Sequence, residues 1–98
     1  MNHLGRIQTL RKQMQARKIE SMLVTYLPDV RYLCGFTGSN AALAVTAKRA
    51  AMFTDGRYTA QSKEETQGAR PVIAKKSALG EACAWLEKSG VKTAHFDP

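Results

Sequence analysis

The sequence lacks the features that most directly indicate a membrane protein or a secreted one. No stretch approaches the roughly 18 to 20 consecutive apolar residues that a membrane-spanning helix needs. Charged residues interrupt the apolar ones throughout the amino-terminal stretch MNHLGRIQTLRK, so it is not a secretory signal. We therefore expect a cytoplasmic protein without a membrane partner. The length predicts one domain over residues 1–98.

Histidine and cysteine are scarce, which limits the chemistry that the chain can perform. The two histidines, His3 and His95, lie near opposite ends of the sequence, and neither belongs to an HExxH motif. The two cysteines, Cys34 and Cys83, form no CxxC pair, so each is expected to pack as a small apolar residue. A catalytic metal site needs several carboxylate and imidazole ligands that converge on one ion. We therefore expect no catalytic residue, no metal ligand and no cofactor in this chain.

Acidic residues are outnumbered by basic ones, which raises the question of a polyanionic partner. Fifteen lysines and arginines against eight aspartates and glutamates give a net charge of +7. The basic residues are spread along the chain, with no run longer than two, and this pattern favours a solvated surface over a nucleic-acid face. The alternative is a basic α/β module that binds nucleic acid through its lysines and the loop from Gly35 to Gly38, which matches a GXXG pattern.

Apolar periodicity and capping residues predict helices that alternate with short strands. Asp29, Asp55 and Ser77 are expected to cap helices, and Pro28 is expected to end a strand. In chain order, the expected elements are a helix over 3–18, a strand over 21–27, a short helix over 29–33, a hairpin over 41–46 and 50–54, a helix over 57–67, a strand over 71–75, a helix over 78–88 and a strand from 92.

The first and last long helices should each bury one face against a sheet. The strand pairs are too close together in sequence for a purely parallel sheet, so we predict a three-layer α/β/α domain with a mixed sheet. The chain ends soon after a strand begins, and we expect that the domain is incomplete at its carboxyl end. The residues expected on the buried helix faces are Leu4, Ile7, Leu10 (or the stem of Arg11) and Met14 in the first helix, and Leu79, Ala82, Cys83 and Leu86 in the last.

Two polar loops that contain glycine flank the predicted hairpin and form the candidate site. Exposed loops on a rigid buried unit are a common way to build a binding site. The spacing around the serine of the first loop does not match a nucleophile elbow, and no histidine partner is near in sequence. The candidate residues are Phe36, Thr37, Gly38, Ser39 and Asn40 in the first loop and Asp55, Gly56, Arg57 and Tyr58 in the second.

Phe36 and the second loop each leave alternatives open. Phe36 lies between two glycines, so its ring could be exposed and enter the pocket of a partner, or it could fold inward onto a core of Leu33 and Leu43. The second loop is best explained as a helix cap and turn. Alternatively, Arg57 or Tyr58 reaches a neighbouring subunit, because these residue types are enriched at interfaces.

Both loops lie within sequence blocks that resemble the N-terminal domain of the creatinase/prolidase (Xaa-Pro peptidase) family. Residues 29–40 read DVRYLCGFTGSN and residues 53–58 read FTDGRY. Family members carry similar blocks in the same order, and a looser resemblance extends from the first helix to the end of the chain.

The resemblance implies a ribonuclease-H-like fold and a noncatalytic role. It implies a parent enzyme that hydrolyses peptide bonds next to proline, as an aminopeptidase or a dipeptidase, with Mn, Co or Zn in a C-terminal catalytic domain that this chain does not contain. It also implies a homo-oligomer, expected to be a dimer, in which the loop Phe36 to Asn40 lies near the substrate entrance of a neighbouring subunit. Proline-containing peptides would then be substrates only of the full-length enzyme.

Overall fold

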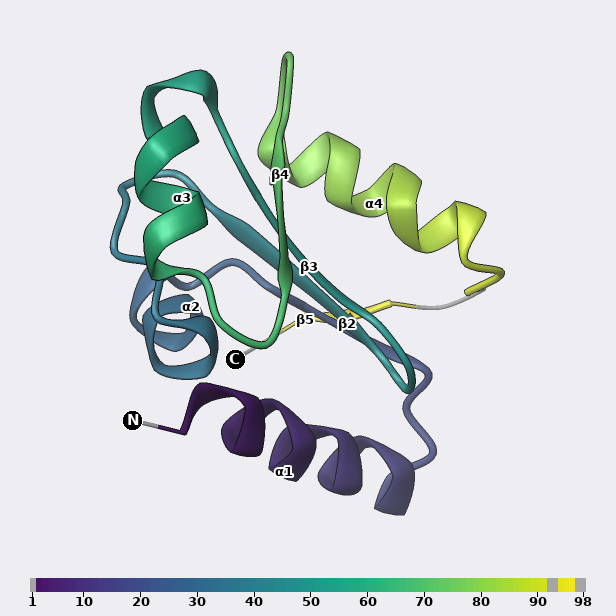
Figure 1. Ribbon diagram of the computed structural model, residues 1–98. Coiled ribbons are helices and arrows are strands. Elements are labelled where there is room, and N and C mark those ends of the chain that lie inside the picture. Colours follow the sequence, from purple (N-terminus) through teal and green to yellow (C-terminus); the bar gives the residue numbers. More distant parts are fainter. Residues whose placement is uncertain (1, 92–93, 97–98) are drawn as a thin grey trace.

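The computed structural model describes residues 2–91 and 94–96, which form one mixed sheet with helices on both faces (Figure 1). The strand order is β4-β3-β2-β1-β5. This is the three-layer α/β arrangement that the sequence predicts. The elements are α1 (His3–Ala16), β1 (Ser21–Val24), α2 (Leu27–Cys34), β2 (Ala42–Thr46), β3 (Ala50–Thr54), the 3₁₀ turn η1 (Gly56–Tyr58), α3 (Thr59–Glu65), β4 (Arg70–Ile73), α4 (Ala78–Lys88) and β5 (His95–Phe96).

The inner strands of the sheet pair antiparallel, and each outer strand is parallel to its neighbour. The central strand β2 pairs antiparallel with β1 on one side and with β3 on the other. The outer strands β5 and β4 are parallel to β1 and β3. The predicted hairpin is therefore confirmed, and its turn over 47–49 is closed by a hydrogen bond of 2.8 Å from the Thr46 amide to the Arg49 carbonyl.

The two faces of β2 explain why an alanine-rich segment forms a central strand. Successive side chains of a strand point to opposite faces. Leu43 and Val45 join the larger core beneath α1 and α2, whereas Ala42 and Ala44 join the core beneath α4. Small residues on the second face let α4 approach the sheet closely, so packing compensates for the low strand propensity of alanine.

The path from β1 into α2 differs from the sequence prediction. The strand ends at Val24, and the helix already begins at Leu27, with Pro28 in its first turn. Proline fits there because the first helical amides have no partner within the helix. Asp29 is therefore not the cap, which is Tyr26 without a side-chain hydrogen bond, and instead lies in the first turn. A carboxylate at that position interacts favourably with the helix dipole.

The buried face of α4 is also rotated relative to the prediction. Ala78, Ala82 and Leu86 are buried, but Leu79 is 44% exposed and Cys83 is exposed. Ala78, Ala82 and Leu86 recur every four residues, and the two alanines pack against the small residues of the sheet. The larger Leu79 side chain therefore lies on the solvent side of the helix. Ser77 caps this helix through a hydrogen bond from the Gly80 amide, as predicted.

The remaining differences concern helix ends and single side chains. In α1, Ile7 and Met14 are buried as predicted, but Leu4 is exposed. The helix expected over 57–67 is divided into η1 and α3. The strand expected from 92 begins at His95, while residues 92 and 93 lie outside the described residues. Cys34 is buried as expected, and desolvation raises the pKa of its thiol.

Candidate functional site

The two candidate loops meet at one end of the sheet because β2 begins where β3 ends. One hydrogen bond ties the first loop to the end of β3, and a second joins the two loops directly. The Thr54 hydroxyl donates to the Asn40 carbonyl over 2.5 Å, and the Asn40 Nδ2 donates to Asp55 Oδ2 over 2.8 Å. The structure therefore brings the predicted site residues together into one surface, which we call the loop cluster (residues 36–40 and 55–58).

Ser39 and Tyr58 form a second connection within the loop cluster. The Ser39 Oγ and the Tyr58 hydroxyl are 2.6 Å apart, and the Ser39 amide donates to the same hydroxyl over 3.2 Å. These hydrogen bonds with Ser39 lower the pKa of the Tyr58 phenol. The serine is thus paired with a tyrosine and not with a histidine, and this pairing does not provide the base that a nucleophilic serine needs.

Asp55 organises the second loop. Its carboxylate accepts hydrogen bonds from the Arg57 amide at 3.0 Å and from Arg57 Nε and Nη2 at 2.9 Å each. The side-chain hydrogen bonds from Arg57 and Asn40 hold the pKa of Asp55 well below its ordinary value. The predicted capping role of Asp55 is confirmed at η1, while the Arg57 side chain remains 66% exposed and can contact another molecule.

Phe36 does not lie on the exposed surface of the loop cluster. Its side chain is only 1% exposed and belongs to the core under α1 and α2, so the inward alternative is confirmed and the exposed one is wrong. Its ring packs edge-on against Tyr58, with centroids 5.5 Å apart. A Cβ at Gly38 would collide with the Phe36 ring, which explains the glycine at that position.

Glu65 is a member of the site that the sequence analysis missed. It accepts hydrogen bonds from the Thr37 amide at 2.8 Å, the Thr37 hydroxyl at 2.9 Å and Gln61 Nε2 at 3.2 Å. Desolvation acts against the ionised form, but the hydrogen bonds from Thr37 and Gln61 lower the pKa of Glu65. No local pattern indicates this contact, because Thr37 and Glu65 are 28 positions apart.

The arrangement suits binding more than catalysis. Ser39, Asn40, Gly56 and Arg57 are exposed and present polar groups to solvent. Over residues 2–91 and 94–96, no group of three or more histidine, cysteine or carboxylate side chains could hold a metal ion. The donor set of the described residues therefore does not fit the divalent metal of a peptidase.

The two histidines lie elsewhere. His3 is buried in α1, and its Nδ1 is 3.2 Å from the Tyr32 carbonyl oxygen. His95 is exposed in β5.

None of the helices in the described part of the chain is long and apolar enough to cross a membrane.

Comparison with known proteins gives the family. Residues 6–97 match the family model of the Creatinase/Prolidase N-terminal domain, so the chain belongs to this family. It is 32% identical over 92 residues to the uncharacterized peptidase YqhT of Bacillus subtilis, and this match covers 94% of the chain. The chain spans about a quarter (26%) of the length of that relative.

Solved structures support the same assignment. The N-terminal domain of the cytoplasmic peptidase PepQ from Mycobacterium tuberculosis has a TM-score of 0.84 at 34% identity, over 95% of this chain and 72% of that one. An Xaa-Pro aminopeptidase from Streptococcus pyogenes has a TM-score of 0.83 at 32% identity, over 97% of this chain and 70% of that one. The fold is therefore that of the N-terminal domains of Xaa-Pro aminopeptidases and prolidases.

Proposed function

We propose that this chain acts as the noncatalytic N-terminal domain of an Xaa-Pro peptidase, and that its loop cluster borders the substrate entrance of a neighbouring subunit. The family assignment and the Xaa-Pro aminopeptidase from Streptococcus pyogenes support this role. The parent enzyme would hydrolyse peptide bonds next to proline. Its divalent metal, Mn, Co or Zn, would be held by a catalytic domain outside these residues. A cytoplasmic location belongs to the proposal, since the related PepQ carries that description.

The observation that carries the proposal is that the loop cluster is both exposed and braced. Asn40 and Asp55 connect the two loops, Ser39 and Tyr58 connect them again, and Glu65 of α3 holds Thr37. A loop that is ordered before it binds loses less conformational entropy on binding. A braced polar surface of this kind suits the rim of an entrance that peptides pass.

The exposed groups of the loop cluster also suit a contact between subunits. Interface rims are polar, and arginine is enriched where subunits meet. The guanidinium of Arg57 is fixed by Asp55 on one edge and is open to solvent over most of its surface. In a homo-oligomer, here expected to be a dimer, this group could contact a carboxylate or carbonyl at the entrance of the adjoining subunit.

The test uses the enzyme that carries this domain together with its catalytic domain. Arg57→Gln removes the exposed charge, and Lys63→Gln on α3 is the matched control because Lys63 is exposed and lies outside the loop cluster. We expect Arg57→Gln to raise KM for an Xaa-Pro peptide severalfold with little change in kcat, since an entrance residue affects binding more than the chemical step.

Thermal unfolding of both variants provides the stability control. The Arg57–Asp55 pair is exposed, so its loss should change the stability of the domain little. An unchanged KM for Arg57→Gln, or an equal rise for both variants, would contradict the proposed entrance role.

A further inference from the structure

The fold gathers basic residues that are scattered in the sequence. The end of α1, the turn between β2 and β3 and the end of α4 lie on one side of the molecule, away from α2 and α3 (Figure 1). We call this surface the basic end. Its basic residues are Arg11, Lys12, Lys18, Lys48, Arg49 and Lys88.

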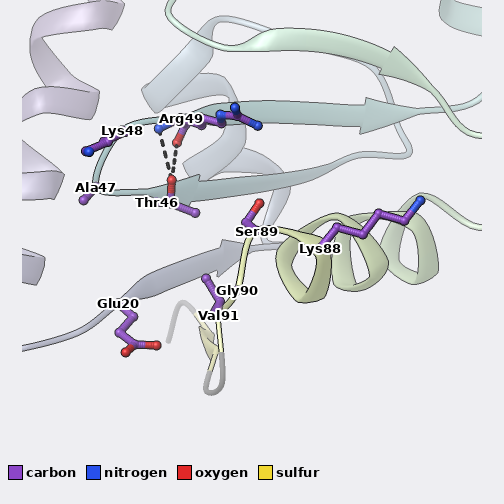
Figure 2. A pocket seen from close by; sticks show the side chains of 9 residues that line it. All are labelled: Glu20, Thr46, Ala47, Lys48, Arg49, Lys88, Ser89, Gly90 and Val91. Atoms are coloured by element: carbon purple, nitrogen blue, oxygen red, sulfur yellow. Dashed lines mark hydrogen bonds between the residues drawn. The ribbon is translucent and has the colours of Figure 1, made fainter.

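Two adjoining open grooves form the basic end. The first, of about 570 Å³, runs between the β2–β3 turn and the end of α4 (Figure 2). The second, of about 460 Å³, runs between the same turn and the end of α1. Glu20 and Ala47 line both grooves, and Glu20 is the only acidic residue among the described lining residues. The basic end is thus strongly positive.

The cations of the basic end do not converge on one point. In Figure 2 the Lys48 side chain extends to the left, whereas those of Arg49 and Lys88, which come from different elements, extend to the right. The ion pair of Arg57 with Asp55 lies at the opposite end of the sheet. The positive charges therefore suit a ligand with many separated negative charges better than one small anion.

We propose that the basic end binds the phosphate backbone of double-stranded nucleic acid without sequence preference. A duplex carries one negative charge per about 1.7 Å of helix axis, and release of its counterions provides affinity without apolar contacts. The exposed large apolar residues of the described chain, Leu4, Tyr26, Tyr32, Leu79 and Phe96, line neither groove. The surface consequently lacks the aromatic platforms that stack single-stranded bases.

The lack of exposed large apolar residues among the described lining residues also argues against two other anionic partners, an acidic protein and a membrane surface. Stable protein interfaces depend on aromatic or large apolar anchors that the partner buries. The large apolar residues among the described lining residues, Met14 and Ile19, are already buried or half-buried within the domain. A surface that inserts into a membrane likewise presents tryptophan, phenylalanine or leucine beside its lysines. The basic end is also distinct from the loop between Gly35 and Gly38, which leads from α2 into β2 at the other end of the sheet.

The test measures binding of the chain to a short mixed-sequence DNA duplex with a fluorescent label, by anisotropy over a series of salt concentrations. One triple variant, Lys48→Gln with Arg49→Gln and Lys88→Gln, neutralises the first groove. A matched triple variant, Lys63→Gln with Lys75→Gln and Lys76→Gln, removes the same charge from exposed positions of α3 and the loop after β4. Circular dichroism establishes that both variants fold.

We expect the native chain to bind at low salt, with a logarithmic affinity that falls linearly with the logarithm of salt concentration. The first triple variant should weaken binding about tenfold or more. It should also reduce the magnitude of the salt slope by up to about 2.7, because each of the three lost phosphate contacts lowers it by about 0.9. The matched variant should change affinity less than about threefold. Glu20→Gln should strengthen binding.

Three results would overturn the proposal. The native chain could fail to bind at low salt. The two triple variants could lose affinity equally, which would assign binding to net charge and not to this surface. Unlabelled polyglutamate could compete as well as unlabelled duplex at equal charge, which would assign the surface to an acidic protein segment.

Discussion

Replacing Phe36 by alanine tests whether the first loop is held by the core beneath it. The ring is 1% exposed, belongs to the core under α1 and α2, and contacts the Tyr58 ring. Truncation of a buried phenylalanine to alanine typically costs about 3 to 5 kcal/mol of stability. A domain of this size has a total stability on the order of 5 to 15 kcal/mol. We therefore expect Phe36→Ala to remove a large fraction of it.

The measurement is urea unfolding followed by the fluorescence of the single tryptophan, Trp85, which packs on Phe53 beneath α4. With a denaturant slope of roughly 1 to 2 kcal/mol per molar urea, the midpoint should fall by about 2 M or more. Phe96→Ala is the matched control, because it makes the same chemical change at a side chain that is 59% exposed. If Phe36→Ala fails to fold, Phe36→Leu should still show a partial loss.

A loss of less than about 1 kcal/mol for Phe36→Ala, or an equal loss for Phe96→Ala, would refute the reasoning, because it would mean that Phe36 is not a core residue.

Three further predictions follow from the site and the sheet edge. Asp55 has a pKa below its unfolded-state value, so its contribution to stability should be present above about pH 4 and be lost as the pH falls further; acid unfolding of Asp55→Asn should lack this component, and an unchanged pH profile would contradict the assignment. The isolated chain should neither hydrolyse an Xaa-Pro peptide nor change its thermal midpoint with Mn²⁺, because the donor set of its described residues does not fit a metal; turnover or retained metal after dialysis would show otherwise. The chain should self-associate, because β5 is an edge strand and its residue Phe96 is exposed; light scattering from a strict monomer at high concentration would count against this.

Local signals in the sequence were sufficient to predict most elements of the fold. The hairpin, the Ser77 cap of α4 and the Asp55 cap of η1 are determined by residues within a few positions of one another. The positions of the two loops followed from the hairpin, because loops at its free strand ends must meet. The family blocks pointed to the same domain, which the comparison with known proteins confirms.

Tertiary packing decided the features that the sequence did not predict. The rotation of α4 depends on the fit of Ala78 and Ala82 to small residues of the sheet, which no helical periodicity contains. The direction of Phe36 depends on space under Tyr58, and the partner of Thr37 lies 28 residues away in α3. The basic end is likewise formed only when the ends of α1, the hairpin and α4 are brought together.

The central claim is that the loop cluster acts on the active site of a neighbouring subunit, and mixed dimers of the full-length enzyme test it most directly. In one mixed dimer, a protomer with Arg57→Gln is paired with a protomer that carries an inactivating metal-ligand change in its catalytic domain. In the other, both changes lie in the same protomer, and its partner is native. The account predicts a native KM for the first dimer, whose working site faces a native loop, and a raised KM for the second. The reverse pattern would show that the loop acts within its own subunit and would contradict the account.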